Sequence, residues 1–255
     1  MRIAVIVNAD DLGMSEHVND AVFGLMTASL ITSGTIMANA PAVRSAVTSA
    51  QRFPSCSFGV HLNLTQFEPL TGGAGAKLLV DQTGRMSRAI ESAPLSVARM
   101  SAIYEEMCAQ VERLVSWGMT ISHFDSHNHV HTKPLFFLPL KAVQRRFAVR
   151  VVRISKNFYS AEEPCPPALY RKKHAYNWAL RHLYRTTTTQ AFAELTTFCS
   201  ATRQQQLAYE SVELMVHPGA ATAESETRQL QSRWFDTSGL PIELLNYSEF
   251  AWRRR

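Results

Sequence analysis

The sequence predicts an α/β fold: a single-domain, distorted (β/α) barrel with parallel strands. Apolar strand patterns alternate with helical patterns along the 255 residues, which is typical of parallel β/α architecture. Polar residues of chemical interest follow several of these strands, and the strand ends form the rim that carries chemistry in β/α barrels. The length and the hydrophobic content of 46% suffice for one large core, and residues 1–255 are therefore expected to form one domain.

Local patterns define the elements in order. Residues 3–7 are a continuous β-branched and apolar run, typical of a buried parallel strand. Ser15 is placed to cap a following helix, and residues 96–117 form the clearest helical pattern, which Gly118 closes. The other predicted strands are residues 30–38, 58–64, 120–126, 149–154 and 212–216, and the other predicted helices are residues 135–147 and 173–184.

Two segments interrupt this alternation. Residues 66–95 are Gly-rich and weakly patterned, which indicates an insertion that borders the site. Prolines break the pattern after residue 157, so we expect residues 157–184 to be irregular apart from the helix predicted at their end.

Composition excludes several classes of protein. The net charge of +5 is spread over basic runs at residues 145–146, 171–173 and 253–255 without a nucleic-acid reading motif, so no nucleic-acid partner is expected. No apolar run is long enough to span a membrane, and the amino terminus lacks the pattern of a signal peptide. The four cysteines are scattered without a CxxC pair. We expect a cytoplasmic protein with reduced, packed thiols.

The densest chemical signal lies in residues 123–131, His-Phe-Asp-Ser-His-Asn-His-Val-His. In an extended chain alternate side chains share a face, which would gather Asp125 and four histidines on one surface. Residues two apart on a strand are separated by about 6.6 Å, whereas a metal–nitrogen bond is only about 2.0–2.1 Å. One histidine would therefore bind a metal, while Asp125 and the others orient it or contact substrate.

Further candidates end other predicted strands. Asp10 and Asp11 end the first strand, and because neighbouring side chains on a strand point in opposite directions, we expect them to differ in role. His61 alone would more often be a structural histidine, and it becomes a candidate metal ligand because other candidate ligands end the neighbouring strands. His217 precedes Pro218-Gly219, and a histidine at a rigid turn suits either a proton donor and acceptor or a turn cap.

Together these motifs resemble the YdjC-like carbohydrate deacetylases, which include chitooligosaccharide deacetylases and the hopanoid-biosynthesis-associated HpnK-like proteins. The matching segments are Asn-Ala-Asp-Asp-Leu-Gly at residues 8–13, Val-His-Leu-Asn-Leu-Thr at 60–65, Asp-Ser-His-Asn-His-Val-His at 125–131 and His-Pro-Gly at 217–219. Leu12 stands where phenylalanine is frequent in the family and Asn128 where histidine or glutamine is frequent. Residues 157–184 match nothing in the family pattern.

The resemblance implies a distorted β/α barrel with one divalent metal ion. Carried over by motif, Asp11, His61 and His127 would bind the ion, Asp10 would be the catalytic base and His217 the general acid. Arg153 would position Asp10, with Arg150 as its competitor for that place. Residues left for substrate contact or for support of the ligands are Asp125, His129, His131 and Arg153.

We therefore expect a metal-dependent hydrolase that removes the acetyl group from an N-acetylated sugar or oligosaccharide, with a glycolipid headgroup as one option. Two imidazole ligands favour zinc and leave nickel, cobalt, manganese or magnesium open. The alternatives are a β/α-barrel metallohydrolase acting on another amide or ester, usually with two metals, and a non-catalytic metal- or sugar-binding protein. A homo-oligomer is also open. Trp117, Trp178 and Trp234 are candidates for a sugar-stacking platform, although core packing is the expected role of each.

Overall fold

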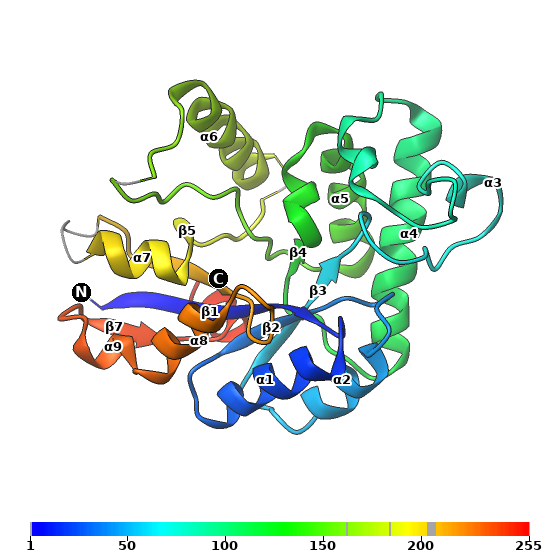
Figure 1. Cartoon of the computed structure of the whole chain (residues 1–255). Helices are drawn as coiled ribbons and strands as arrows, with labels where there is room; N and C mark the ends of the chain where they lie inside the picture. Colours follow the sequence, from blue (N-terminus) through cyan, green and yellow to red (C-terminus); the bar gives the residue numbers. More distant parts are fainter. Residues whose placement is uncertain (1, 162, 184, 203–207, 255) are drawn as a thin grey trace.

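The computed structural model describes residues 2–161, 163–183, 185–202 and 208–254. Its centre is a seven-stranded sheet in the order β4-β3-β2-β1-β6-β5, in which β7 also pairs with β1 and every pairing is parallel (Figure 1). Helices α1 and α2 pack against each other and against the sheet, while α4 and α5 pack together beyond β3. The predicted α/β class with parallel strands is confirmed.

The sheet curls as a distorted barrel does. The predicted strand at residues 149–154 lies beside β4 at the edge of the sheet, in the gap between β4 and β5 where the barrel would close. In the described part of the chain this segment forms single parallel bridges rather than a regular strand, Val152 with Phe124 of β4 and Val151 with Thr187. The regular strands are β1 (Ile3–Leu12), β2 (Ser33–Ile36), β3 (Ser57–Leu62), β4 (Phe124–Ser126), β5 (Ala191–Glu194), β6 (Ser211–Val216) and β7 (Ile242–Leu244).

The first strand is longer than its apolar run predicts. β1 continues through the polar residues to Leu12, but its register with β2 shifts between Ala9 and Leu12. Within this bulge Asp11 has a left-handed backbone with φ of 66°. A bulge re-aims side chains beside functional sites, and this one lies at the end of the strand that carries both aspartates.

Most predicted helices are confirmed. Ser15 caps α1 (Glu16–Thr27), its hydroxyl accepting a 3.2 Å bond from the Val18 N–H. The clearest helical pattern is α4 (Val97–Ser116), which Gly118 follows with φ of 85°. The remaining longer helices are α5 (Pro134–Phe147) and α6 (Pro167–His182).

The segment expected to be irregular contains the start of α6, so that expectation is wrong for residues 167–172, whereas the predicted helix is confirmed over residues 173–182. The helix begins six residues before the predicted start because Pro167 occupies its first turn, where a missing N–H leaves no bond unmade. The predicted end at Tyr184 lies outside the described residues. Short elements escaped the sequence patterns: α2 (Val43–Ala50), α3 (Gly73–Ala76), η1 (Arg88–Ser92), η2 (His127–Thr132), α7 (Leu195–Thr202), α8 (Glu224–Gln231), α9 (Trp234–Thr237) and α10 (Tyr247–Arg253).

The side chains expected in the core mostly lie there. Trp234 is buried and Trp117 packs against the core, but Trp178 is 56% exposed on α6, so its predicted core role is wrong. In the described part of the chain, which includes all four cysteines, no disulfide is formed. Among the described residues, no helix is both long and apolar enough to cross a bilayer.

Candidate active site

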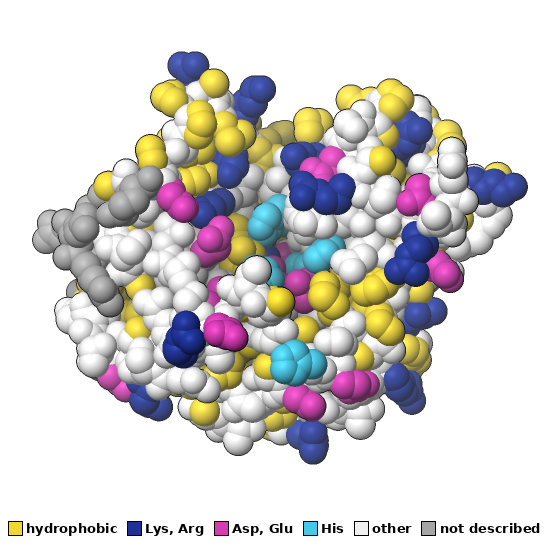
Figure 2. All heavy atoms as spheres, viewed as in Figure 1, with side chains coloured by type: hydrophobic (Ala, Val, Ile, Leu, Met, Phe, Trp, Pro, Cys, Tyr) yellow, Lys and Arg dark blue, Asp and Glu magenta, His cyan; other side chains and the backbone are white. Residues whose placement is uncertain are grey.

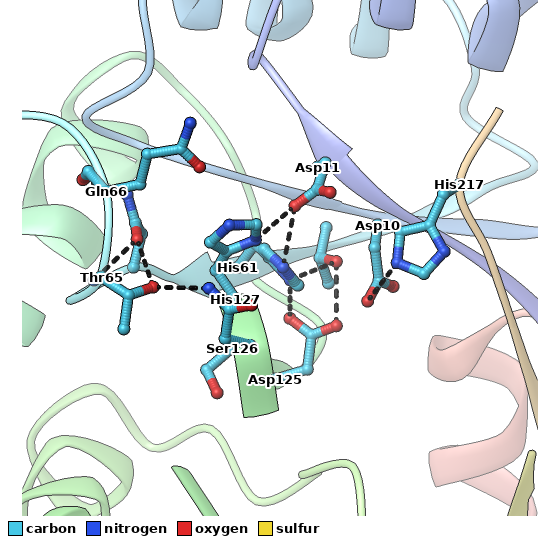
Figure 3. Close-up of polar contacts among 12 residues, drawn as sticks. Asp10, Asp11, His61, Thr65, Gln66, Asp125, Ser126, His127 and His217 are labelled. Atoms are coloured by element: carbon cyan, nitrogen blue, oxygen red, sulfur yellow. Dashed lines mark hydrogen bonds and ion pairs between the residues drawn. The ribbon is translucent and has the colours of Figure 1, made fainter. Parts of the chain in front are cut away.

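The sequence candidates converge at the carboxyl ends of four strands (Figure 3). Asp10 and Asp11 come from the end of β1, His61 from β3, His127 from the residue after β4, and His217 from the residue after β6. Figure 2 shows histidine and acidic side chains on the floor of a hollow between two projections of the surface. The parallel sheet therefore brings distant segments of the chain to one place.

Asp11 is the hub of a cluster with two histidines. Its Oδ1 lies 2.8 Å from His127 Nδ1 and 3.2 Å from His61 Nε2. The Asp11 and His127 side chains are 14% and 16% exposed, whereas the His61 side chain is 2% exposed. Burial raises the pKa of Asp11, but its bonds to His127 and His61 outweigh this and hold the pKa well below its usual range. The carboxylate is ionised and faces the hollow.

The donor atoms of this cluster fit one divalent ion. Ligand atoms bound to a single metal at about 2.0–2.2 Å lie roughly 3 Å apart, which matches the two distances from Asp11 Oδ1. His61 Nδ1 is 2.8 Å from Asp125 Oδ1, so its Nε2 remains for the ion. A ligating histidine usually donates its second ring N–H to a carboxylate in this way.

Asp125 thus contacts His61 of the neighbouring strand, and the prediction that it orients the histidines of its own segment is wrong. Its second oxygen accepts a 3.0 Å bond from the Thr35 hydroxyl and lies 2.9 Å from Arg153 Nη2. Burial lowers the pKa of His61, but the carboxylates of Asp125, Asp10 and Asp11 together outweigh burial and hold the pKa well above the ordinary value. Asp125 fixes the ring orientation and the tautomer of His61.

Asp10 has a different environment from its neighbour. Arg153 Nη1 and Nη2 donate 2.6 Å bonds to the two Asp10 oxygens, and Asn8 Nδ2 donates a third bond of 2.9 Å. Burial raises the pKa of Asp10, but the guanidinium outweighs burial and holds the pKa well below the usual range. His217 Nε2 lies 4.0 Å from Asp10 Oδ2, and its side chain is 34% exposed. Arg150, the competitor, is exposed and lines a different surface pocket.

The prediction that four histidines share one face is wrong. The extended chain ends at Ser126, and η2 follows with left-handed backbones at Asn128 and His129, both with φ of 53°. His127 alone among the histidines of residues 123–131 belongs to the Asp11 cluster. His123 instead stacks on Tyr247, with ring centroids 3.8 Å apart.

The remaining two histidines differ from each other. His131 is fully buried, with Nδ1 2.6 Å from the Ser126 hydroxyl and Nε2 3.1 Å from the Arg153 carbonyl. Both of its ring nitrogens are used, so it supports the site and does not face the hollow. His129 packs edge-on against Phe192, and its buried Nδ1 has no hydrogen-bond partner among the residues that the structure describes. Burial lowers the pKa of His129 to about 3, and the Arg153 charge adds to this effect.

Three further residues complete the site and were missed. The Thr35 hydroxyl contacts both His61 and Asp125. Thr35 lies within β2, and nothing in the sequence of that strand distinguishes it from an ordinary strand residue. Glu213 accepts a 2.6 Å bond from Arg153 Nε, and burial raises its pKa to about 7 although Arg153 opposes the rise. A charged residue inside the apolar run of residues 212–216 was a signal that could have found it. Glu226 of α8 accepts a 2.5 Å bond from the His217 N–H.

The fold and the strand-end cluster define a parallel β/α protein with a metal-type Asp-His-His set. The chain belongs to the YdjC-like family, because the family model for YdjC-like proteins matches residues 4–246. It is 39% identical over 153 residues to a carbohydrate deacetylase of Geobacillus stearothermophilus, covering 59% of this chain and 60% of that protein. It is 34% identical over 145 residues to a carbohydrate deacetylase of Vibrio cholerae, covering 57% and 56% respectively. The matches thus span less than two thirds of these relatives' own length.

Solved structures share the fold at low sequence identity. A putative cellobiose-phosphate cleavage protein from Enterococcus faecalis superposes with a TM-score of 0.76 at 21% identity, covering 98% of this chain and 99% of that one. A family 4 acetyl xylan esterase from Clostridium thermocellum, solved in complex with a cobalt ion, gives a TM-score of 0.50 at 12% identity, covering 96% and 89%. These likenesses establish the architecture.

Proposed function

We propose that this protein is a metal-dependent hydrolase that removes the N-acetyl group from an acetylated sugar or oligosaccharide, releasing acetate and a free amine. One observation carries the proposal: an Asp11–His61–His127 cluster lies next to a second carboxylate, Asp10, which faces His217. The family membership and the names of the curated relatives, which are carbohydrate deacetylases, support it.

Asp11, His61 and His127 would hold one divalent ion. Such an ion would polarise the acetamide carbonyl and acidify a water molecule. The set supplies three protein ligands, which is the number found in catalytic zinc sites that keep a position open for water or substrate. Two imidazoles favour zinc, and cobalt, nickel, manganese and magnesium are the other ions to compare.

Asp10 would accept the proton of the attacking water. The guanidinium of Arg153 keeps this carboxylate ionised and fixes the direction of both its oxygens. A base must be oriented as well as ionised, because proton transfer requires hydrogen-bond geometry in the reacting complex. Arg153 provides both conditions from one buried side chain.

His217 would protonate the leaving amine. Its ring lies at the edge of the hollow, partly exposed, while its backbone N–H is held by the buried Glu226. An amine is a poor leaving group unless a positioned acid delivers a proton to it. Asp10 and His217 lie beside each other on one side of the Asp11 cluster (Figure 3), with 4.0 Å between His217 Nε2 and Asp10 Oδ2, so both side chains would reach a substrate bound at that cluster.

The alternative of a two-metal hydrolase is disfavoured by charge. A second set of possible ligands is formed by Asp10, His61 and Asp125. Arg153, however, lies 2.6 Å from Asp10 and 2.9 Å from Asp125, so a cation already occupies the position between these carboxylates. A binding protein without turnover would not require the Asp10–His217 pair. A cytoplasmic location, a single domain and a homo-oligomer stay predictions.

The proposal is tested by loading the purified protein with Zn²⁺, Co²⁺, Ni²⁺, Mn²⁺ or Mg²⁺ in turn and offering a panel of N-acetylated mono- and oligosaccharides. We expect acetate release with at least one substrate and about one ion bound per chain. Metal binding without acetate release on any substrate would favour a binding protein, and two ions per chain would favour the two-metal alternative.

A further inference from the structure

Two projections of the surface flank the hollow that holds the candidate active site (Figures 1 and 2), and hydrophobic atoms lie at the ends of both (Figure 2). One projection is the amino-terminal half of α6, where Leu169 and Tyr170 are 44% and 40% exposed. The other is the start of α4, where Leu95 and Val97 are 64% and 80% exposed. We call these four residues the tip residues. Aliphatic side chains this exposed at two neighbouring points indicate a surface that meets an apolar partner.

The α6 projection is also strongly basic. Residues 164–180, which include the amino-terminal half of α6, contain Arg171, Lys172 and Lys173 and no Asp or Glu. Arg171 and Lys172 are exposed directly beside Leu169 and Tyr170. In Figure 2, basic and hydrophobic atoms lie together over α6. Apolar side chains next to cations are the pattern of a helix that lies in the interface of an anionic membrane.

The inner face of α6 is fixed to the site, so the exposure of its outer face is not a sign of loose packing. Asn177 exchanges bonds of 2.8 and 3.0 Å with the backbone of Ser155. The Tyr176 hydroxyl donates a 2.7 Å bond to the His131 carbonyl, and Leu180 is fully buried. A partner that binds the outer face of α6 would therefore be held at a fixed position relative to the hollow.

We propose that the two projections dock on an anionic lipid bilayer, with the tip residues entering the interface and the hollow opening toward the headgroup layer. Two points of contact on either side of one hollow would orient the site toward the membrane. A second copy of the chain is a poorer partner, because the basic α6 of one copy would meet the equally basic α6 of the other. In that position the site would meet a sugar that is carried by a lipid, and this inference about the substrate rests on the proposed function.

Vesicle sedimentation tests the docking without reference to catalysis. The full chain should bind phosphatidylglycerol vesicles, should bind phosphatidylcholine vesicles weakly, and should lose most binding at about 1 M salt, where the Debye length is about 3 Å. The double variant Val97→Ser, Leu169→Ser should need roughly ten-fold more anionic lipid for half-maximal binding, because it replaces the tip residue with the highest fractional exposure on each projection. Arg171→Gln with Lys172→Gln should weaken binding and reduce its salt dependence.

The chain offers a matched control on the same two helices. Val115 and Leu183 are each 47% exposed, and they lie about 27 Å and about 21 Å along the helical rise from Val97 and Leu169. The double variant Val115→Ser, Leu183→Ser should bind vesicles as the unaltered chain does. Equal loss in the two double variants, or no binding of the unaltered chain to anionic vesicles, would overturn the proposal.

Two measurements separate the remaining outcomes. Sedimentation equilibrium that finds a dimer dissociated by Val97→Ser with Leu169→Ser, together with no vesicle binding, would assign the tips to self-association and overturn membrane docking. Metal content and turnover on a soluble acetylated sugar should be unchanged in the tip variant. If vesicles bind but no variant releases acetate, the docking stands and the proposed function fails.

Discussion

Replacing Arg153 with lysine would keep a positive charge in the centre of the site and remove the fork that holds Asp10. The two 2.6 Å bonds from Arg153 to Asp10 are parallel and charge-assisted, and a single ammonium cannot reproduce both. Loss of one such bond costs about 1.5–3 kcal/mol. If the bond orients Asp10 in the transition state, kcat should fall roughly 10- to 150-fold.

The same variant should change the pH dependence in a defined direction. Burial raises the pKa of Asp10 and the guanidinium lowers it, with the lowering dominant. A weaker cationic partner therefore lets the pKa rise, and a base that is protonated at higher pH loses activity at higher pH. The acid limb of the kcat profile should move upward. Because the depressed pKa stabilises the folded protein above the unfolded pKa of Asp, about 3.9, the variant should also unfold at a higher pH on acidification.

The assay is kcat against pH on metal-loaded protein, with metal content and thermal unfolding measured in parallel. Arg150→Lys, which alters an exposed arginine three residues away, is the matched control and should change none of these quantities. A folded, metal-loaded Arg153→Lys protein with an unchanged kcat and acid limb would refute the role of Asp10 as the base that Arg153 positions.

Three further predictions concern the proposed division of labour. His61→Ala and His127→Ala should each lose most bound metal, and full occupancy in both by elemental analysis would contradict the ligand assignment. Asp10→Asn should retain metal and lose turnover because an amide cannot accept the proton of water, while Asp11→Asn should bind metal more weakly; the reverse pattern would mean that the two roles are exchanged. His217→Ala should leave metal affinity nearly unchanged and slow amide hydrolysis by roughly 10²–10⁴-fold, with a smaller loss on an activated aryl ester, whereas equal losses on both substrates would argue for a structural histidine.

The strand ends were predictable because the apolar runs that lead to them are continuous. Residues 3–7 and 212–216 read as buried parallel strands, and β1 and β6 pair throughout this region. Once two such strands are parallel neighbours, Asp10 and His217 must lie at the same edge of the sheet. The prediction that these side chains share one edge depends only on strand direction. It is therefore correct although the predicted bounds of β2, β3 and β4 differ from the observed ones by up to several residues.

The local path of the chain after β4 was not predictable in the same way. Asn128 and His129 adopt left-handed backbones without being glycine, and such residues cost about 1–3 kcal/mol that only the surrounding structure can offset. No sequence pattern marks the turn, so the predicted alternation runs to His131, five residues beyond the end of β4 at Ser126. The partner of Asp125 was missed for a related reason, since His61 comes beside it through the β3–β4 register.

The adjacent aspartates illustrate how the fold assigns different chemistry to identical side chains. Asp10 is buried against the guanidinium of Arg153, which already pairs with its negative charge, so a further cation would stabilise Asp10 little. The bulge turns Asp11 toward two imidazoles. Histidines bind a metal ion as neutral rings, and in that form they would balance none of the charge of Asp11. A divalent ion would supply that balance, and it would therefore be drawn to Asp11 rather than to Asp10. The left-handed φ of Asp11 is the conformational cost of this separation, because it belongs to the bulge that shifts the β1–β2 register and turns Asp11 toward the histidines.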